Sequence, residues 1–207
     1  MTTISGSYTP SDLVDAIANR KNYEVTDTAT NISDSGNWAA IFSTNSPVTK
    51  LTVAGVNPPL TVSSDQYKTA VQNKPQLMAG LLKTSAVVNG ATVVSDFSNL
   101  VVQNVDATTF TKANQDKHVA KMTISMTGAG LTAAIKGVMT SNKIEAGGIT
   151  VTDTAPGAVK LTYSQFMEFG GNTNGTLQSG SALEKFAGTG AIFSITGATI
   201  QQADTLK

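Results

Sequence analysis

Cysteine is absent from the 207 residues, and histidine occurs once, as His118. The absence of cysteine excludes disulfides, thiolate metal sites and thiol catalysis. A Ser-His-Asp triad or a multi-histidine metal site would depend on His118 alone. We therefore expect that the protein is not an enzyme.

Charged side chains are scarce. The chain has 14 basic and 14 acidic residues, so its net charge is zero, and charged residues make up 14% of the sequence against about 25% in an ordinary soluble domain. Such a chain has no long-range field to attract nucleic acid or an anionic membrane surface. It also repels its own copies weakly. We expect a protein that is exported, assembles with itself, or both.

Long apolar runs are missing as well. No stretch approaches the roughly 20 apolar residues of a membrane span. The first residues lack the basic start and apolar run of a secretory signal. We therefore expect no membrane insertion, and a location outside the cell or on its surface that is reached without a cleaved N-terminal signal in this sequence.

Strand patterns alternate with short helical patterns along the chain. Pro10 after Thr9 predicts the start of a helix, and Ser63 with Gln66 predicts a capping box that begins another. Pro75 interrupts this second helix. The remaining helices are predicted at 76–82 and 131–139, and the strands at 23–26, 48–54, 60–63, 86–94 with a break at 89–90, 100–105, 121–127, 149–152 and 195–200. The fold class we expect is mixed α/β and β-rich.

Three short signatures occur twice in the same order, which indicates an imperfect internal repeat. The pairs are Val25–Ala29 with Val151–Ala155, Leu60–Ser63 with Leu161–Ser164, and Gly90–Val93 with Gly197–Ile200. We expect a solenoid-like fold in which each unit buries its apolar face against the next. The predicted segments are 1–99 (an N-terminal helix and the first copy), 100–148 (an insertion or a diverged repeat) and 149–207 (the second copy).

These signatures carry a resemblance to a class of bacterial proteins. Residues 23–32, 60–67 and 195–206 resemble the strand-helix repeats of S-layer-like and adhesin-like surface proteins that are exported by type I secretion. The resemblance implies a cell-surface or extracellular location and homotypic assembly. Residues 170–175 contain the glycines but not the aspartate of the calcium-binding nonapeptide found in such proteins, so the resemblance leaves calcium as a weakly supported ligand and implies no other cofactor.

Three aspartates are the weak candidates for a metal site. Asp27 and Asp153 occupy equivalent repeat positions, and Asp34 precedes a glycine turn. Carboxylates at these places either bind calcium or end a strand by bonding to the following backbone. The sequence favours the second interpretation for Asp27 and Asp153. The segment that begins at Asp34 lacks the aspartate density and the terminal glutamate of an EF-hand loop, so it supports calcium only weakly.

Other single residues have a structural and a functional interpretation. We expect His118 in a solvated turn, and the alternative is an axial haem ligand paired with a tyrosine. Trp38 is predicted to be a core anchor on a helix, with an exposed binding aromatic as the alternative. Gly128 to Gly130 predict a strand-to-helix turn rather than a phosphate-binding loop, because no P-loop lysine follows.

The function we expect is self-assembly into a surface layer, filament or matrix. The predicted assembly residues are Ile195, Ala198 and Ile200, on a C-terminal strand with an open edge. The equivalent strand at 88–93 is expected to be covered by the chain that follows it, through Phe97 and Leu100. Removal of residues 195–207 should abolish assembly. The alternative function is a monomeric secreted module in which residues 100–148 bind carbohydrate, calcium or haem, with the ligand-binding residues unknown.

Overall fold

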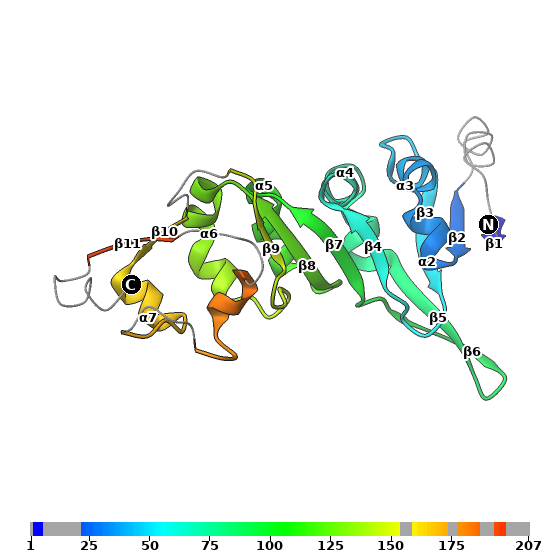
Figure 1. The fold of residues 1–207 in the computed structure, drawn as a ribbon. Helices are drawn as coiled ribbons and strands as arrows, with labels where there is room; N and C mark the ends of the chain where they lie inside the picture. The colour runs from blue at the N-terminus through cyan, green and yellow to red at the C-terminus, as the bar shows by residue number, and fades with distance from the viewer. Residues whose placement is uncertain (1, 6–21, 154–158, 174–177, 187–192, 198–207) are drawn as a thin grey trace. The chain divides into compact units, whose positions relative to one another are not determined.

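The structure is a computed structural model that describes residues 2–5, 22–153, 159–173, 178–186 and 193–197 (Figure 1). Strands and helices are interspersed along these residues, which confirms the mixed α/β class, and within the described residues helices take up about as much of the chain as strands. Within the described ranges, no helix has both the length and the apolar character needed to cross a membrane.

The chain divides into two compact units. The first comprises residues 1–103 and 116–120, and the second comprises residues 104–115 and 121–207. The predicted segments rest on sequence repetition rather than on packing, so their boundaries stay a prediction.

Five strands form the larger sheet of the first unit, in the order β1-β2-β3-β5-β6. They are β1 (Thr2–Ser5), β2 (Tyr23–Asp27), β3 (Val48–Ala54), β5 (Leu82–Val88) and β6 (Ala91–Asp96). The first four strands are parallel to one another, whereas β5 and β6 form an antiparallel hairpin at one edge. Parallel neighbours require a crossover, and between β2 and β3 this is α2 (Ala29–Ser33) and α3 (Ser35–Phe42).

A second strand pair of the same unit joins β4 (Leu60–Ser63) to β7 (Leu100–Val105) in parallel. Helix α4 (Ser64–Asn73) follows β4, and a π-helical turn, η1 (Leu77–Leu81), leads into β5. The predicted interruption at Pro75 is confirmed, and the predicted helix after it is this short π-helical turn.

The second unit pairs β8 (Val119–Met126) with β9 (Ile149–Val151) and β10 (Val159–Thr162) with β11 (Phe193–Thr196), both in parallel. Its helices are α5 (Ala107–Gln115), α6 (Gly128–Thr140), α7 (Tyr163–Glu168) and the 3-10 turn η2 (Ala182–Phe186). Lys185 of η2 donates to the carbonyls of Val138, Met139 and Ser141 at 3.0, 2.6 and 2.7 Å. These bonds hold the end of α6, and burial lowers the pKa of Lys185.

Within the described residues one local unit occurs five times: a strand that ends at, or just before, a side chain that caps a helix. In each case the cap accepts a hydrogen bond from the backbone N–H three residues further on, which satisfies a donor that the first turn of the helix leaves free. The caps are Thr28 before α2, Ser63 before α4, Asp106 before α5, Thr127 before α6 and Thr162 before α7.

The caps correct the predicted alignment of one repeat signature. Ser63 and Thr162 both form capping boxes, with Gln66 and Gln165 respectively. Counted from the caps, Leu60 corresponds in position to Val159 and not to Leu161, which differs from the predicted match by two positions. The shared Leu-Thr dipeptide misled the alignment, because hydrogen bonding at the cap, not residue identity, determines where the helix begins.

The core of the first unit contains Trp38 on α3, as predicted. Its ring lies 4.3 Å from that of Phe42, and its Nε1 donates to the carbonyl of Gln66 at 2.9 Å. The Gln66 side chain in turn donates to the carbonyl of Ser33 at 3.1 Å. These contacts connect helices α2, α3 and α4 of the first unit.

Other predicted elements agree to within a few residues. The break at 89–90 is the turn of the β5–β6 hairpin, and Gly128 to Gly130 begin α6 after β8, as expected. Helix α5 and the separate helix α2 were not predicted. The helix predicted after Thr9 lies outside the described residues.

Candidate assembly surface

The β5–β6 hairpin is closed by a two-residue turn, Asn89-Gly90. Both residues have positive φ, 50° and 80°, as the hairpin turn of type I′ requires. Val88 faces Ala91 next to the turn, and the pairing continues without a bulge to Lys83 and Asp96. The hairpin is therefore a regular two-stranded arm.

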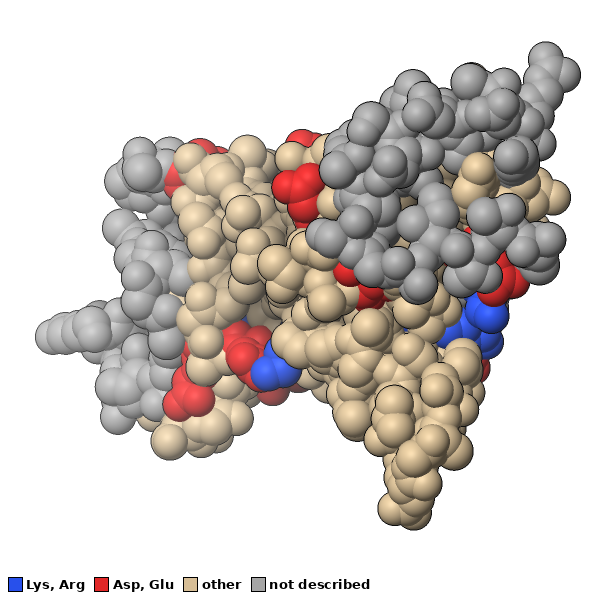
Figure 2. All heavy atoms as spheres, turned by 90° about the vertical axis from the view of Figure 1, so that its right-hand side faces the viewer, with Lys and Arg blue, Asp and Glu red and all other residues tan. Residues whose placement is uncertain are grey.

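Apolar side chains of this arm are exposed to solvent. Val87, Val88, Val93 and Val94 are 72, 50, 49 and 51% exposed. They are four of the five large apolar side chains that lie exposed among the described residues, and the fifth is Val56 at 83%. In Figure 2 the hairpin is the projection at the bottom of the view, with no charged side chain at its tip. We call Val87, Val88, Val93 and Val94 the valine patch.

Strand β6 is also the last strand of its sheet within the described residues, and all six of its residues are exposed. Its one charged side chain, Asp96, forms an ion pair with Lys83 across the hairpin. The hydrogen bond from Lys83 and its charge lower the pKa of Asp96. This edge therefore presents backbone groups and valines with one neutralised charge.

The expectation that following chain covers the strand at 88–93 was wrong. Phe97 and Leu100 are buried at 1 and 0% exposure, yet the valines before them remain in solvent. Phe97 follows the base of the hairpin and Leu100 begins β7, so neither residue reaches the arm. Valines at adjacent positions on both sides of Asn-Gly were the sequence signal for this surface, because they place apolar groups on both faces of the hairpin.

The predicted assembly strand at the C-terminus is partly described. It forms as β11, which begins at Phe193 and pairs with β10, and Ile195 lies opposite Leu161. Within the described residues, β11 has a strand on one side only, and Ile195 is partly exposed. Ala198 and Ile200 lie outside the described residues.

All three candidate metal ligands accept hydrogen bonds from backbone N–H groups, which are local for Asp27 and Asp34 but 25 residues away in the sequence for Asp153. Asp27 is buried, and its Oδ1 accepts from the Thr28 N–H at 2.7 Å and from Asn31 Nδ2 at 2.9 Å, while its Oδ2 has no partner. Asp34 caps α3 by accepting from the backbone N–H groups of Gly36 and Asn37. Asp153 accepts from the Gly128 N–H at 2.6 Å. The described ranges contain no cluster of three or more His, Asp or Glu residues that could hold a metal ion.

His118 is not in a solvated turn, which corrects the prediction. It is 3% exposed, and its Nδ1 lies 2.8 Å from Oδ1 of Asp116. Tyr67 donates to Oδ2 of the same carboxylate at 2.9 Å. The chain folds this turn inward because Asp116 can satisfy both buried rings.

Electrostatics of this network keep Asp116 ionised and Tyr67 protonated. Burial alone would raise the pKa of Asp116, but hydrogen bonds from His118 and Tyr67 outweigh burial and lower it. Burial, followed by the charge of Asp116 and the hydrogen bond to it, raises the pKa of Tyr67 well above its ordinary value. The structure thus brings His118 and one tyrosine to a shared carboxylate, which is a buried structural arrangement.

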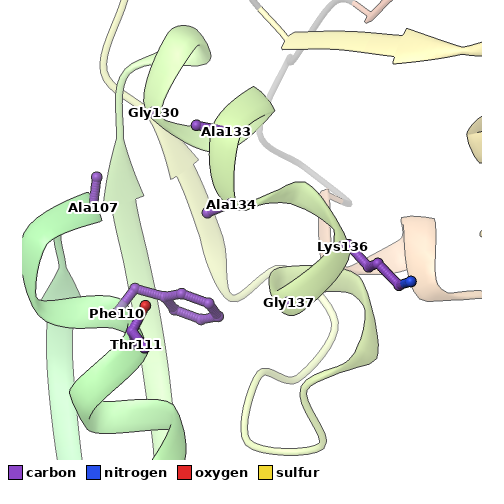
Figure 3. Close-up of a pocket in the computed structure, with 8 residues that line it drawn as sticks. All are labelled: Ala107, Phe110, Thr111, Gly130, Ala133, Ala134, Lys136 and Gly137. Carbon is purple, nitrogen blue, oxygen red and sulfur yellow. The ribbon is translucent and has the colours of Figure 1, made fainter.

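A shallow groove of about 360 Å³ lies between α5 and α6 in the second unit (Figure 3). It is lined by Ala107, Phe110, Thr111, Gly130, Ala133, Ala134, Lys136 and Gly137. Figure 3 shows the Phe110 ring lying between the helices, with Lys136 extending away from it. A Cβ at Gly137 would lie 3.0 Å from the Phe110 ring, so glycine allows this close packing of the helices.

Among the surfaces of the described residues, the valine patch with the β6 edge, the β11 edge and the α5–α6 groove are candidates for recognition. Comparison with family models, with curated proteins and with solved structures found nothing that matches this chain.

Proposed function

We propose that this protein is a structural protein that assembles with itself, outside the cell or on its surface, into a layer, filament or matrix. The observation that carries the proposal is the valine patch on an open sheet edge. Solvent-exposed apolar arms of this kind are found where another protein surface covers them, and an unprotected edge strand is a template for pairing with a further chain.

The charge distribution supports assembly between identical copies. The chain has zero net charge, and residues 84–95 of the hairpin contain no charged side chain. Copies that approach through this arm therefore meet little electrostatic repulsion. The proposal needs no cofactor, and the burial of the single histidine supports a role that is not enzymatic.

The recurring strand-cap-helix unit supports a solenoid-like architecture as part of this proposal. Parallel strands are joined through short capped helices. The strands before the caps are buried on one face, as a stack of repeats requires. End faces of such arrays need a cap or a partner. A self-assembling repeat protein uses those ends as contacts.

Lysine substitution at the valine patch tests the proposal. Val93→Lys should weaken association at least about tenfold, which a loss of about 1.4 kcal/mol produces, because a charge must then be buried in the contact. The measurement is light scattering after size exclusion over a range of concentrations. Val56→Lys is the matched control, since it adds the same charge at an exposed valine outside the hairpin. Equal weakening by both substitutions would count against the patch.

The second candidate function is a monomeric module that binds cell-surface carbohydrate through residues 100–148. The α5–α6 groove favours it, because all lining residues lie in that segment and an aromatic ring is among them. This candidate requires a monomer at every concentration, so the same scattering measurement separates the two functions.

A further inference from the structure

We infer that β6 pairs antiparallel with β6 of a second copy of this chain, about a two-fold axis at Val93. The inference rests on the proposed self-assembly and specifies its contact. The partner is a second copy of this chain because β6 is complementary to itself. Its one charge is paired within its own chain, and its exposed valines match the valines of another copy.

The edge of β6 lacks the features that normally prevent such pairing. Edge strands are protected by proline, by lysine, by bulges or by covering segments. Ala91 to Asp96 contain neither proline nor lysine, and the pairing of β5 with β6 has no bulge. All six residues are exposed.

Backbone hydrogen bonding restricts the register. The Phe97 N–H donates to the Leu82 carbonyl across the hairpin. Backbone groups in an antiparallel strand alternate between its two sides, so Thr92, Val94 and Asp96 direct theirs to the open edge. Pairing between two copies must place these residues opposite one another. A two-fold axis at residue 93 or at residue 94 does so, whereas a register displaced by one residue does not.

Side-chain chemistry selects the axis at Val93. Val93 lies opposite Ala86 within the hairpin, so this axis creates an apolar row of Ala86, Val93, Val93 of the second copy and Ala86 of the second copy. An axis at Val94 would give a row that ends in Ser85 on both sides. With the axis at Val93, each Thr92 faces Val94 of the second copy.

Charges are compatible with this arrangement. The antiparallel orientation places the two Asp96 side chains at opposite ends of the paired strands. Each is neutralised by Lys83 of its own chain. No like charges lie opposite each other, so the destabilisation that such pairs cause in sheets is avoided.

Single cysteines test the register directly, since the chain has no cysteine of its own. Val93→Cys places two thiols across the axis in a non-hydrogen-bonded pair, where the Cα atoms are about 4.5 Å apart and a disulfide can form. Under mild oxidation we expect at least about tenfold more disulfide-linked dimer than from Val56→Cys, because groups held together react at a high effective concentration. Thr92→Cys and Val94→Cys should cross-link when mixed, and much less when each is alone.

The outcomes separate this inference from the proposed function. Cross-linking of Val94→Cys alone, without Val93→Cys, would overturn the axis. Assembly by light scattering with no β6 cross-link above the Val56→Cys level would overturn the interface and leave self-assembly standing. A wild-type protein that stays monomeric at all concentrations would overturn both. Since each substituted side chain is exposed, circular dichroism should show unchanged folding for every variant.

Discussion

At the scale of single residues, the Tyr67–Asp116–His118 network is the most consequential arrangement inside the first unit. Asp116 accepts from two buried rings, and these hydrogen bonds lower its pKa in the folded protein. A carboxyl group with a lowered folded-state pKa stabilises the fold above its unfolded pKa of about 4. That stabilisation is lost as the pH falls through the folded-state value.

We predict that Tyr67→Phe destabilises the protein by about 2 kcal/mol at pH 7, the usual cost of removing a hydrogen bond to a charged group. The loss should shrink as the pH falls below about 4, because protonated Asp116 no longer gains from the tyrosine donor. Urea denaturation at several pH values measures both effects.

Tyr163→Phe is the matched control for this prediction, since it removes the same hydroxyl from a partly exposed helix start. It should change the stability by less than about 0.5 kcal/mol. If the cost of Tyr67→Phe does not vary between acid and neutral pH, Asp116 is not the group that Tyr67 stabilises.

At the scale of elements, side-chain caps determine where the helices begin. The Ser63 hydroxyl accepts from the Gln66 N–H, and the Ser63 N–H donates to Oε1 of Gln66. We predict that Ser63→Ala costs about 1 kcal/mol of stability, the typical value for a lost cap. Thr61→Ala on the exposed face of the preceding strand should cost clearly less, as judged by thermal unfolding. Equal costs would show that the cap is not the determinant.

Local signals of this kind explain which elements could be predicted from the sequence. The capping box at Ser63 and the turn at Asn89-Gly90 each depend on a few neighbouring residues, and the burial of Trp38 follows from its large apolar ring. The structure confirms all three. Helix α5 was missed because its sequence, Ala107 to Gln115, is mostly polar with Phe110 as its one large apolar residue, and because its aspartate cap also suits a turn.

The burial of His118 and the exposure of the valine patch were harder to predict, because both depend on residues that are distant in the sequence and close in space. The burial of His118 requires Asp116 and Tyr67 to meet, although Tyr67 lies 49 residues before Asp116. The exposure of the valine patch depends on β5 and β6 extending past the elements that bury Phe97. Alternation shows that a strand has an apolar face, but it does not show whether that face is covered.

At the scale of the whole molecule, the proposal assigns two strand edges to assembly. The β6 contact about Val93 is isologous and, by itself, produces a closed dimer. In this proposal the predicted C-terminal contact through Ile195 is a second two-fold contact. Two different two-fold contacts extend a dimer into a chain of copies. A protein with both contacts extends into a filament. Removal of residues 195–207 leaves the β6 contact and therefore stops assembly at dimers, which revises the sequence-based expectation that this removal abolishes assembly.

The central claim, that the chain assembles with itself through uncharged surface, is tested most directly by sedimentation velocity of the unmodified protein over a wide range of concentrations and salt. We predict an average mass that rises with concentration. We also predict that it changes little with sodium chloride, since the β6 edge has no unpaired charge to screen, and that it increases with sulfate, which strengthens apolar burial. A single species of monomer mass at every concentration and in every salt would contradict the account.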